Sequence, residues 1–334
     1  TYKVLLTAIS KLSSASAADL NSNMGITTNI PDLYQDDGVD LRLTAMTVSA
    51  GLYCDIAVQT TRTTTMTVDE LGFPKADVSA IREIAKRRTG LTLITGAVRT
   101  GKNTTVLAIA NELQKLPIQI VEYSNPVEVR MGYAQKDYHG DINILQNCLR
   151  LAKKQDIDIA ILNEIPDAGV AFAVRDLVNS SIGVITTMHI NRVWHAPNKL
   201  HEFFGKDYKT IISQLNAVVN QKLFKVWQAP GLQKRILQPT QGDLEKFAYK
   251  WGVRQYFVPT DISKVTYRIQ PLAEIIILTD EERTAMLNFD ELSRSEQMLK
   301  SHVEKAKGTL ECKLADFINQ GLCSLDQMEK LKTE

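Results

Sequence analysis

The sequence predicts an α/β protein built around a mostly parallel sheet, and three observations carry that prediction. Short apolar runs alternate with helical patterns between residues 91 and 188. A loop with glycines at phosphate-loop spacing joins the first apolar run to a helix. Polar residues follow the carboxyl ends of predicted strands, where ligands bind in such sheets: Lys102, Glu164 and His189.

Length and composition set the outer limits. A chain of 334 residues suits two domains, and 44% hydrophobic with 23% charged residues is typical of a globular protein with a substantial core. A net charge of +1 argues against a general nucleic-acid footprint. Four scattered cysteines without a Cys-x-x-Cys pair argue against a disulfide scaffold or zinc ribbon and favour a reducing compartment. No apolar run is long enough to cross a membrane, and because the sequence begins at Thr1 we expect further residues upstream.

The region before the loop is expected to form a small unit of its own. Residues 1–25 begin with a helical apolar pattern, and residues 26–40, rich in Asp, Asn, Thr and Pro, are expected to be loop. Val39 to Thr44 alternates like a half-buried strand, and Leu52 to Val58 is its expected partner. The threonine-rich residues 60–65 are either a linker or an exposed strand edge.

The glycine loop follows the apolar strand Leu91–Thr95. Gly96 and Gly101 allow backbone N–H groups to surround a phosphate, and Lys102 reaches the outer phosphates. Asn103 stands where a Ser or Thr hydroxyl normally binds magnesium, so the usual pattern is not fully matched. The alternative is an ordinary turn between a strand and a helix.

The remaining elements are expected in the following order. Helices are predicted at 77–88, 103–116, 142–154, 168–178 and 209–226, and strands at 118–123, 158–162, 183–188 and 265–277. Residues 228–260 read as irregular, and the chain from 279 onward reads as helical, with Ser324 capping a final short helix.

Three side chains have a functional and a structural interpretation. Glu164, at the tip of a buried strand, either works on magnesium or the attacking water, or caps the next helix. His189 either senses a γ-phosphate or is a hydrogen-bonded structural residue. Arg42 is either a solvated strand residue or, if subunits form a ring, a charge stabiliser in a neighbour's site.

The order of the motifs resembles the secretion ATPases of type IV pilus assembly and type II secretion. Seven segments carry the resemblance over nearly the whole chain: Leu71-Gly72-Phe73, the Walker A-like loop at 93–102, Asn125-Pro126-Val127-Glu128, Gly132 with Gln135, the Walker B-like run at 150–167, Thr187-Met188-His189-x-Asn191, and Gln221-Lys222-Leu223. Among these, residues 93–102 resemble the family's phosphate loop and residues 125–128 its aspartate box. Residues 150–167 resemble its Walker B segment, and residues 187–191 its histidine box.

The resemblance implies a fold and a set of roles. It implies a small N-terminal α/β, PAS-like domain over residues 1–62, a RecA-like P-loop ATPase domain over 63–278 and a C-terminal helical subdomain over 279–334. ATP and Mg²⁺ are the implied cofactors. The implied nucleotide-binding residues are Gly96, Arg99, Thr100, Gly101, Lys102, Asn103 and Thr104, the catalytic ones are Glu164, Glu128, His189 and Arg42, and the metal-binding ones are Asn103, Glu122 and Glu128.

The implied function is a hexameric motor. It would be cytoplasmic, peripherally associated with the inner membrane, and would act on a membrane platform protein and other pilus-machine components, without nucleic acid. The long region after Thr279 favours an extension motor, and the divergence of the motifs suggests a type IVb system such as a bundle-forming pilus. A type II secretion motor, a retraction motor, a catalytically weak nucleotide-binding subunit and a DNA-directed motor remain as alternatives.

The motifs also depart from the family pattern. Besides Asn103, the aspartate box has Ser124-Asn125 where the family has Glu-Asp, and Pro166 replaces an arginine. Glu122 lies two residues before Ser124 and points to the same side of a strand, so we expect it to compensate in part. The region from Trp227 to Tyr256 has no cysteine where many extension ATPases carry a zinc motif.

Overall fold

The N-terminal part contains a small antiparallel sheet. The computed structural model describes residues 66–125, 127–239 and 242–332 and, before them, the backbone of three strands, β1 (Ile26–Tyr34), β2 (Val39–Val48) and β3 (Gly51–Thr60). The strands pair in the order β1-β2-β3, which confirms the two expected strands. The expected loop over 26–40 is wrong for residues 26–34, because β1 is an edge strand and an edge tolerates Pro31. The expected helix within 1–25 and residues 61–65 lie outside the described residues.

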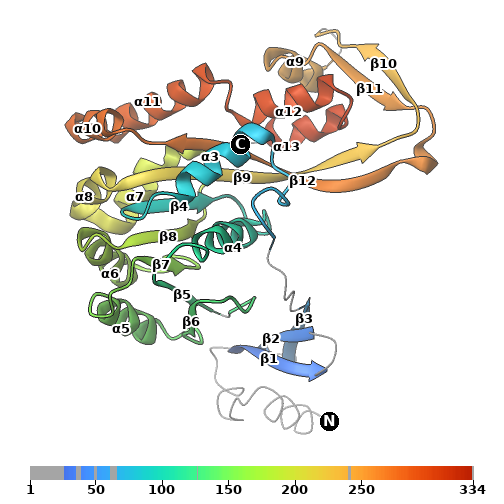
Figure 1. Ribbon diagram of the computed structural model, residues 1–334. Coiled ribbons are helices and arrows are strands. Elements are labelled where there is room, and N and C mark those ends of the chain that lie inside the picture. Colours follow the sequence, from blue (N-terminus) through green and yellow to red (C-terminus); the bar gives the residue numbers. More distant parts are fainter. Residues whose placement is uncertain are drawn as a thin grey trace.

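A seven-stranded sheet forms the centre of the described chain (Figure 1). Its order is β12-β9-β4-β8-β7-β5-β6, parallel from β9 to β6, with β12 antiparallel at one edge. The strands are β4 (Leu91–Thr95), β5 (Ile120–Ser124), β6 (Ala134–Asp137), β7 (Ile159–Leu162), β8 (Gly183–Met188), β9 (Leu215–Gln228) and β12 (Thr266–Ile277). The α/β fold with a mainly parallel sheet is therefore confirmed.

Helices cover both faces of this sheet, as expected for short buried parallel strands. One face packs against α3 (Lys75–Ala85) and α4 (Lys102–Leu113). The other packs against α5 (Ile142–Ala152), α6 (Ala168–Asn179), η1 (Val193–His195), α7 (Ala196–Phe204), η2 (Gly205–Asp207), α8 (Tyr208–Ser213), α10 (Asp280–Asn288) and α11 (Leu292–Lys305). The helical character of the C-terminal region is confirmed, whereas the predicted domain boundary after residue 278 stays a prediction.

The helix predicted over 209–226 is wrong. Only α8 is helical there, and the 14-residue strand β9 follows it. β9 lies between β4 and β12, so its inner half is buried on both faces and shows no strict alternation. Its apolar residues also happen to recur at intervals of three and four residues, which is the spacing of an amphipathic helix.

An arm extends from this body where β9 and β12 run past the other strands (Figure 1). Residues 228–260 are not irregular, as predicted, but form β10 (Leu232–Ile236), α9 (Asp243–Lys250) and β11 (Gln255–Pro259), with β10 and β11 paired antiparallel. A short turn, η3 (Ile262–Lys264), leads into β12. We define the arm as residues 222–270.

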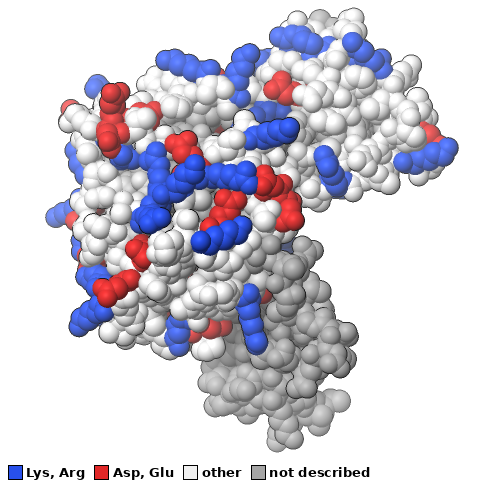
Figure 2. All heavy atoms as spheres, viewed as in Figure 1, with Lys and Arg blue, Asp and Glu red and all other residues white. Residues whose placement is uncertain are grey.

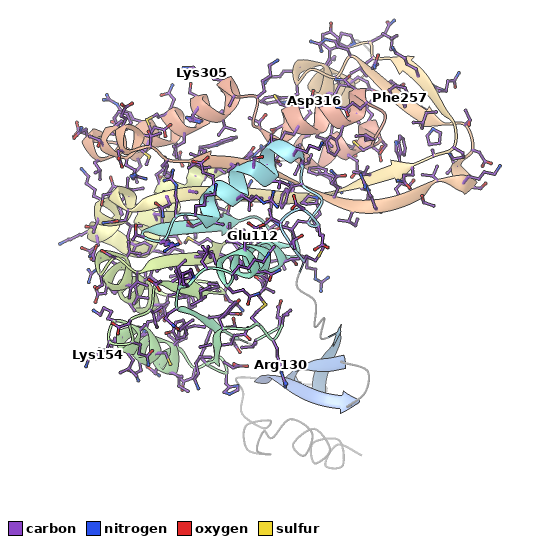
Figure 3. The ribbon with its side chains drawn as sticks, in the orientation of Figure 1. Glu112, Arg130, Lys154, Phe257, Lys305 and Asp316 are labelled. Carbon is purple, nitrogen blue, oxygen red and sulfur yellow. The ribbon has the colours of Figure 1, made fainter. Side chains whose placement is uncertain are left out.

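A separate apolar cluster attaches the arm to the C-terminal helices. It joins Phe224 and Leu272 of the arm's base strands to α9, to α12 (Leu310–Asn319), to η4 (Leu325–Met328) and to α13 (Glu329–Lys332). Figure 3 marks Phe257 of β11 and Asp316 of α12 in this part of the molecule. Ser324 precedes η4 as expected, although its side chain makes no capping hydrogen bond.

Candidate functional site

The glycine loop connects β4 to α4 with a strained backbone. Gly96 and Gly101 have φ angles of 141° and 84°, and Arg99 between them has 62°. A Cβ atom on Gly96 would lie 2.5 Å from the Gln221 carbonyl oxygen and 2.7 Å from Thr100 Oγ1. Only glycine fits there, so the spacing that identified the loop has a steric cause.

Lys102 is the first residue of α4 and folds back over the loop. Its Nζ donates hydrogen bonds to the carbonyl oxygens of Gly96 (3.0 Å) and Ala97 (2.8 Å). Burial lowers the pKa of Lys102, and the charge of Glu164 opposes that shift. The ammonium group is therefore held inside the loop, where an anion would meet it together with the N-terminus of α4.

The loop rests on β9 through buried hydrogen bonds. Gln221 Nε2 donates to the Thr100 carbonyl (2.7 Å), and Thr105 Oγ1 donates to Gln221 Oε1 (2.8 Å). Thr95 Oγ1 donates to the Val219 carbonyl (3.2 Å). In the sequence, Gln221 is only part of a motif. Its contact with the loop becomes visible only once the position of β9 beside β4 is known.

A cavity of about 600 Å³ opens in front of this loop, within the range of ligand pockets. It is formed by the loop, the start of α4 and the carboxyl ends of β5, β7 and β8. Its lining is Val98, Arg99, Thr100, Gly101, Lys102, Asn103, Thr104, Asn125, Glu128, Tyr138, Asn163, Glu164, Thr187 and His189. The structure thus brings together most of the side chains that the sequence singled out.

Glu164 and His189 both face this cavity. Asp167, rather than Glu164, caps α6, since its Oδ1 accepts a hydrogen bond from the Val170 backbone N–H (2.8 Å). His189 is exposed, and within the described residues its ring makes no hydrogen bond. Both structural alternatives for these residues are therefore without support in the described contacts.

The acidic side of the cavity differs from the loop side. Asn103 Nδ2 donates to Glu128 Oε1 at 3.3 Å, so the side-chain amide of Asn103 lies beside a carboxylate at the start of α4. Both residues also line a small void of about 10 Å³, near the least space that can hold one water molecule. Glu122, Asn163 and Thr187 share its lining with Asn103 and Glu128.

Glu122 is buried below the floor of the large cavity. Ser124 Oγ donates to its Oε1, while Gln135 Nε2 (2.7 Å) and Tyr133 OH (3.2 Å) donate to its Oε2. Burial, and secondarily the carboxylate of Glu122, raises the pKa of Tyr133. Glu122 and Ser124 do share one side of β5, as expected, but the three donors that hold Glu122 could not be assigned from the sequence.

The donor set at this side fits a magnesium ion bound jointly with phosphates. Mg²⁺ usually takes one or two carboxylates and keeps several waters, and Glu128 with the Asn103 amide oxygen provides such a partial set. Within the described ranges, no group of three or more His, Cys, Asp and Glu side chains is arranged to hold a metal by itself. The predicted metal role of Glu122 stays a prediction. The predicted catalytic role of Arg42 also stays a prediction, because Arg42 lies on β2, where only the backbone is described.

A buried polar network connects the phosphate loop to the C-terminal helices. Thr95 Oγ1 lies 3.4 Å from Asn220 Oδ1, and Asn220 Nδ2 donates to the Asn191 carbonyl (2.7 Å) and towards Glu274 Oε2 (3.4 Å). Arg192 then pairs with Glu274 (2.8 Å) and with Glu311 of α12. Burial raises the pKa of Glu274, and Arg192 opposes this shift. Sequence reasoning missed Arg192, Asn220, Glu274 and Glu311, because they meet only in the folded sheet.

The fold and the site together define a P-loop type α/β domain, in which a glycine loop joins the carboxyl end of an inner strand of a mainly parallel sheet to a helix. The family described as type II/IV secretion system protein matches residues 22–330, and the chain belongs to this family.

Relatives in sequence are secretion and pilus proteins. The chain is 24% identical over 309 residues to the "Type II secretion system ATPase E" of Vibrio cholerae, which covers 89% of this chain and 59% of that protein. It is 29% identical over 157 residues to the "Type IV pilus assembly ATPase PilB" of Myxococcus xanthus, covering 46% of this chain and 27% of that protein. The chain covers 59% of the length of the Vibrio cholerae protein and 48% of another type II secretion relative, so it spans about half the length of these relatives.

Solved structures share the fold. The Legionella pneumophila ATPase DotB superposes with a TM-score of 0.75 at 18% identity, over 100% of this chain and 84% of that one. The pilus retraction motor PilT with bound ADP gives 0.68 at 16% identity, over 98% and 83%. No helix among the described residues is long and apolar enough to span a membrane.

Proposed function

We propose that this chain hydrolyses ATP as a subunit of a homohexameric motor that powers type IV pilus assembly. The observation that carries the proposal is the 600 Å³ cavity, where the loop and Lys102 face Glu128, Glu164 and His189 across the ends of four strands. That arrangement offers cations and N–H groups to phosphates on one side and carboxylates on the other. Positioning and charge neutralisation of this kind carry most of the catalysis in phosphoryl transfer.

Each residue has a stated role in this proposal. Gly96, Arg99, Thr100, Gly101 and Thr104 surround the phosphates, and Lys102 exchanges its two carbonyl partners for phosphate oxygens. Glu164 orients the attacking water and takes up its proton, while His189 contacts the γ-phosphate and Arg42 approaches a neighbouring subunit's nucleotide. Asn103 and Glu128 would hold Mg²⁺, with Glu122 behind them. The bound ion would supply positive charge that neutralises the phosphates.

The wider assignment draws on the relatives. Proteins named as type II secretion and type IV pilus ATPases share the family, which supports a subunit that works at the cytoplasmic side of an inner membrane with a platform protein. A type II secretion or pilus-retraction motor is the alternative within the family. A count of pili on cells carrying Lys102→Ala separates the two pilus functions, because loss of pili indicates extension and excess pili indicates retraction.

A second candidate is a nucleotide-binding subunit with negligible turnover. Asn103 and the Ser124-Asn125 pair favour it, because both replace residues that normally handle magnesium or water.

Phosphate release from ATP tests the two candidates. Wild-type chain and Glu164→Gln are measured with Mg²⁺ and with excess chelator, and Glu83→Gln, an exposed carboxylate on α3, is the matched control. A motor requires Mg²⁺-dependent release that Glu164→Gln lowers by about 100-fold or more and that the control retains. Wild-type release no higher than that of Glu164→Gln, with ADP still bound, identifies the weak subunit instead.

A further inference from the structure

The arm has a strong excess of positive charge, unlike the chain as a whole. Between residues 222 and 270 there are nine Lys and Arg residues against three Asp and Glu, whereas the whole chain has a net charge of +1. Figure 2 shows Lys and Arg spread over the arm at the upper right, and a mixture of both signs over the body. The sequence-wide charge therefore conceals a strongly basic segment.

Several of these cations have no carboxylate beside them. Asp243 pairs with Lys246 and Asp261 with Lys264, both at the surface. Lys225, Lys234, Arg235 and Arg268 are exposed, and among the described residues none of the four has an acidic partner. Such a surface attracts an anionic partner.

Exposed apolar side chains gather on the same segment. Six of the eleven exposed large hydrophobic residues in the described chain belong to the arm. The most exposed are Ile262 (76%), Ile236 (65%), Tyr267 (59%) and Ile269 (58%). Single exposed apolar side chains are common on protein surfaces. Their concentration on one projecting element indicates a contact surface.

Strand pairing brings part of this set to the outer end of the arm. Thr266 pairs with Gln228, Leu232 pairs with Pro259, and the Thr260 N–H donates to the Gly231 carbonyl (3.1 Å). Residues 228–232 and 259–267 therefore meet at one end, with Ile262 and Tyr267 exposed there. We call this region the arm tip.

We propose that the arm tip docks on an anionic phospholipid surface, with Ile262 and Tyr267 entering the headgroup region. Lys264 of the tip, with Lys234 and Arg268 on the strands next to it, faces lipid phosphates. Isoleucine and tyrosine flanked by Lys and Arg are suited to a membrane interface, where tyrosine places its ring at headgroup depth. Basic residues add attraction to anionic lipids that falls with salt. The projecting tip favours a bilayer over a protein partner, because a stable protein interface buries about 800 Å² on each side and a few side chains at the end of an arm do not supply that area.

This inference rests on the proposed peripheral membrane association and is independent of ATP hydrolysis. The chain is floated through a density gradient, without nucleotide, with phosphatidylcholine vesicles that contain or lack phosphatidylglycerol. One variant removes the apolar tip (Ile262→Ser with Tyr267→Ser), and another removes two charges (Lys234→Gln with Arg268→Gln). The matched control is Leu151→Ser with Phe172→Ser, two exposed apolar residues on the body.

The expected result is at least tenfold stronger flotation with phosphatidylglycerol, loss of at least tenfold in both tip variants, and no change in the control. ATP hydrolysis without vesicles, and the melting temperature, stay as in the wild type for all variants, so a lipid-binding failure is separate from a failure of the motor.

Three results overturn the proposal. The first is equal flotation with and without phosphatidylglycerol, or equal loss in the control. The second is duplex DNA binding that needs Lys234 and Arg268 but not Ile262 and Tyr267, which identifies a nucleic-acid surface. The third is self-association that the apolar tip variant abolishes, which identifies a second copy of the chain as the partner.

Discussion

The two sides of the cavity are held in different ways. The loop side rests on β9 through buried contacts of Thr100 with Gln221 and of Thr95 with Val219. From Thr95 the buried contacts continue through Asn220, Glu274 and Arg192 to α12. The acidic side rests on contacts between side chains, with Asn103 and Glu128 partly exposed at 3.3 Å. Buried backbone anchors restrict the loop to one conformation, whereas partly exposed pairs can rearrange around an ion. In the proposed function, this difference would make a rigid phosphate site beside an adaptable magnesium site.

Breaking the far end of the network should have the largest effect on stability. Arg192→Met leaves Glu274 and Glu311 buried without their cation, which should lower the free energy of unfolding by about 3–5 kcal/mol. Urea unfolding of the wild type and of Arg192→Met measures this decrease in the free energy of unfolding.

Arg175→Met is the control for that measurement. Arg175 also pairs with two carboxylates, Asp176 and Asp207, but its side chain is 26% exposed, so the expected cost is about 1 kcal/mol or less. An equal decrease in the free energy of unfolding in the two variants would mean that burial does not increase the contribution of the Arg192 network to stability.

Removing the loop's cation should have the next largest effect. Lys102→Ala deletes the ammonium group that donates into the loop, and phosphate release from ATP should fall by about 10²–10³-fold. Lys115→Ala removes an exposed lysine just after the same helix and should leave the rate unchanged. If Lys102→Ala keeps the wild-type rate, the loop is not where the phosphates are handled.

The shape of the glycine loop could be predicted from the sequence because the information that specifies it is local. Gly96, Gly101 and Lys102 lie within seven residues, and steric demands on a tight loop leave a visible spacing. The strands ending at Glu164 and His189 were also found, because short buried parallel strands appear as apolar runs.

The supports of the site could not be predicted in the same way. Gln221 reaches the loop across 121 residues and Glu311 reaches Arg192 across 119, and no periodicity records such a meeting. The sequence of β9 resembles that of a helix because burial on both faces removes the alternation typical of a strand. Glu122 is an intermediate case. Strand geometry predicts that it shares one side of β5 with Ser124, but it does not predict the hydrogen bonds that Tyr133 and Gln135 donate to Glu122.

Weakening the loop's support should cost less than removing its lysine. Gln221→Ala removes both buried hydrogen bonds beneath the loop, so ADP affinity measured without Mg²⁺ should fall by about tenfold. Gln228→Ala, at the exposed end of the same strand, is the control and should bind ADP like the wild type. An unchanged affinity in Gln221→Ala would show that the loop keeps its shape without β9 and would remove the proposed rigidity of the phosphate side.

The acidic side is best tested by restoring what it lacks. Asn103→Thr replaces the amide by the hydroxyl that normally binds magnesium at this position, and it also releases Glu128 from its 3.3 Å contact. The Mg²⁺ concentration for half-maximal ATP hydrolysis should fall by a few-fold, roughly threefold to tenfold, because a better-matched oxygen ligand strengthens a site that has few protein ligands. Thr104→Ala separates the alternatives, since Thr104 follows Asn103 in the chain, lines the same cavity and offers another hydroxyl. If Thr104→Ala raises the Mg²⁺ requirement and Asn103→Thr leaves it unchanged, Thr104 already supplies the missing oxygen, and the acidic side is adapted rather than weakened.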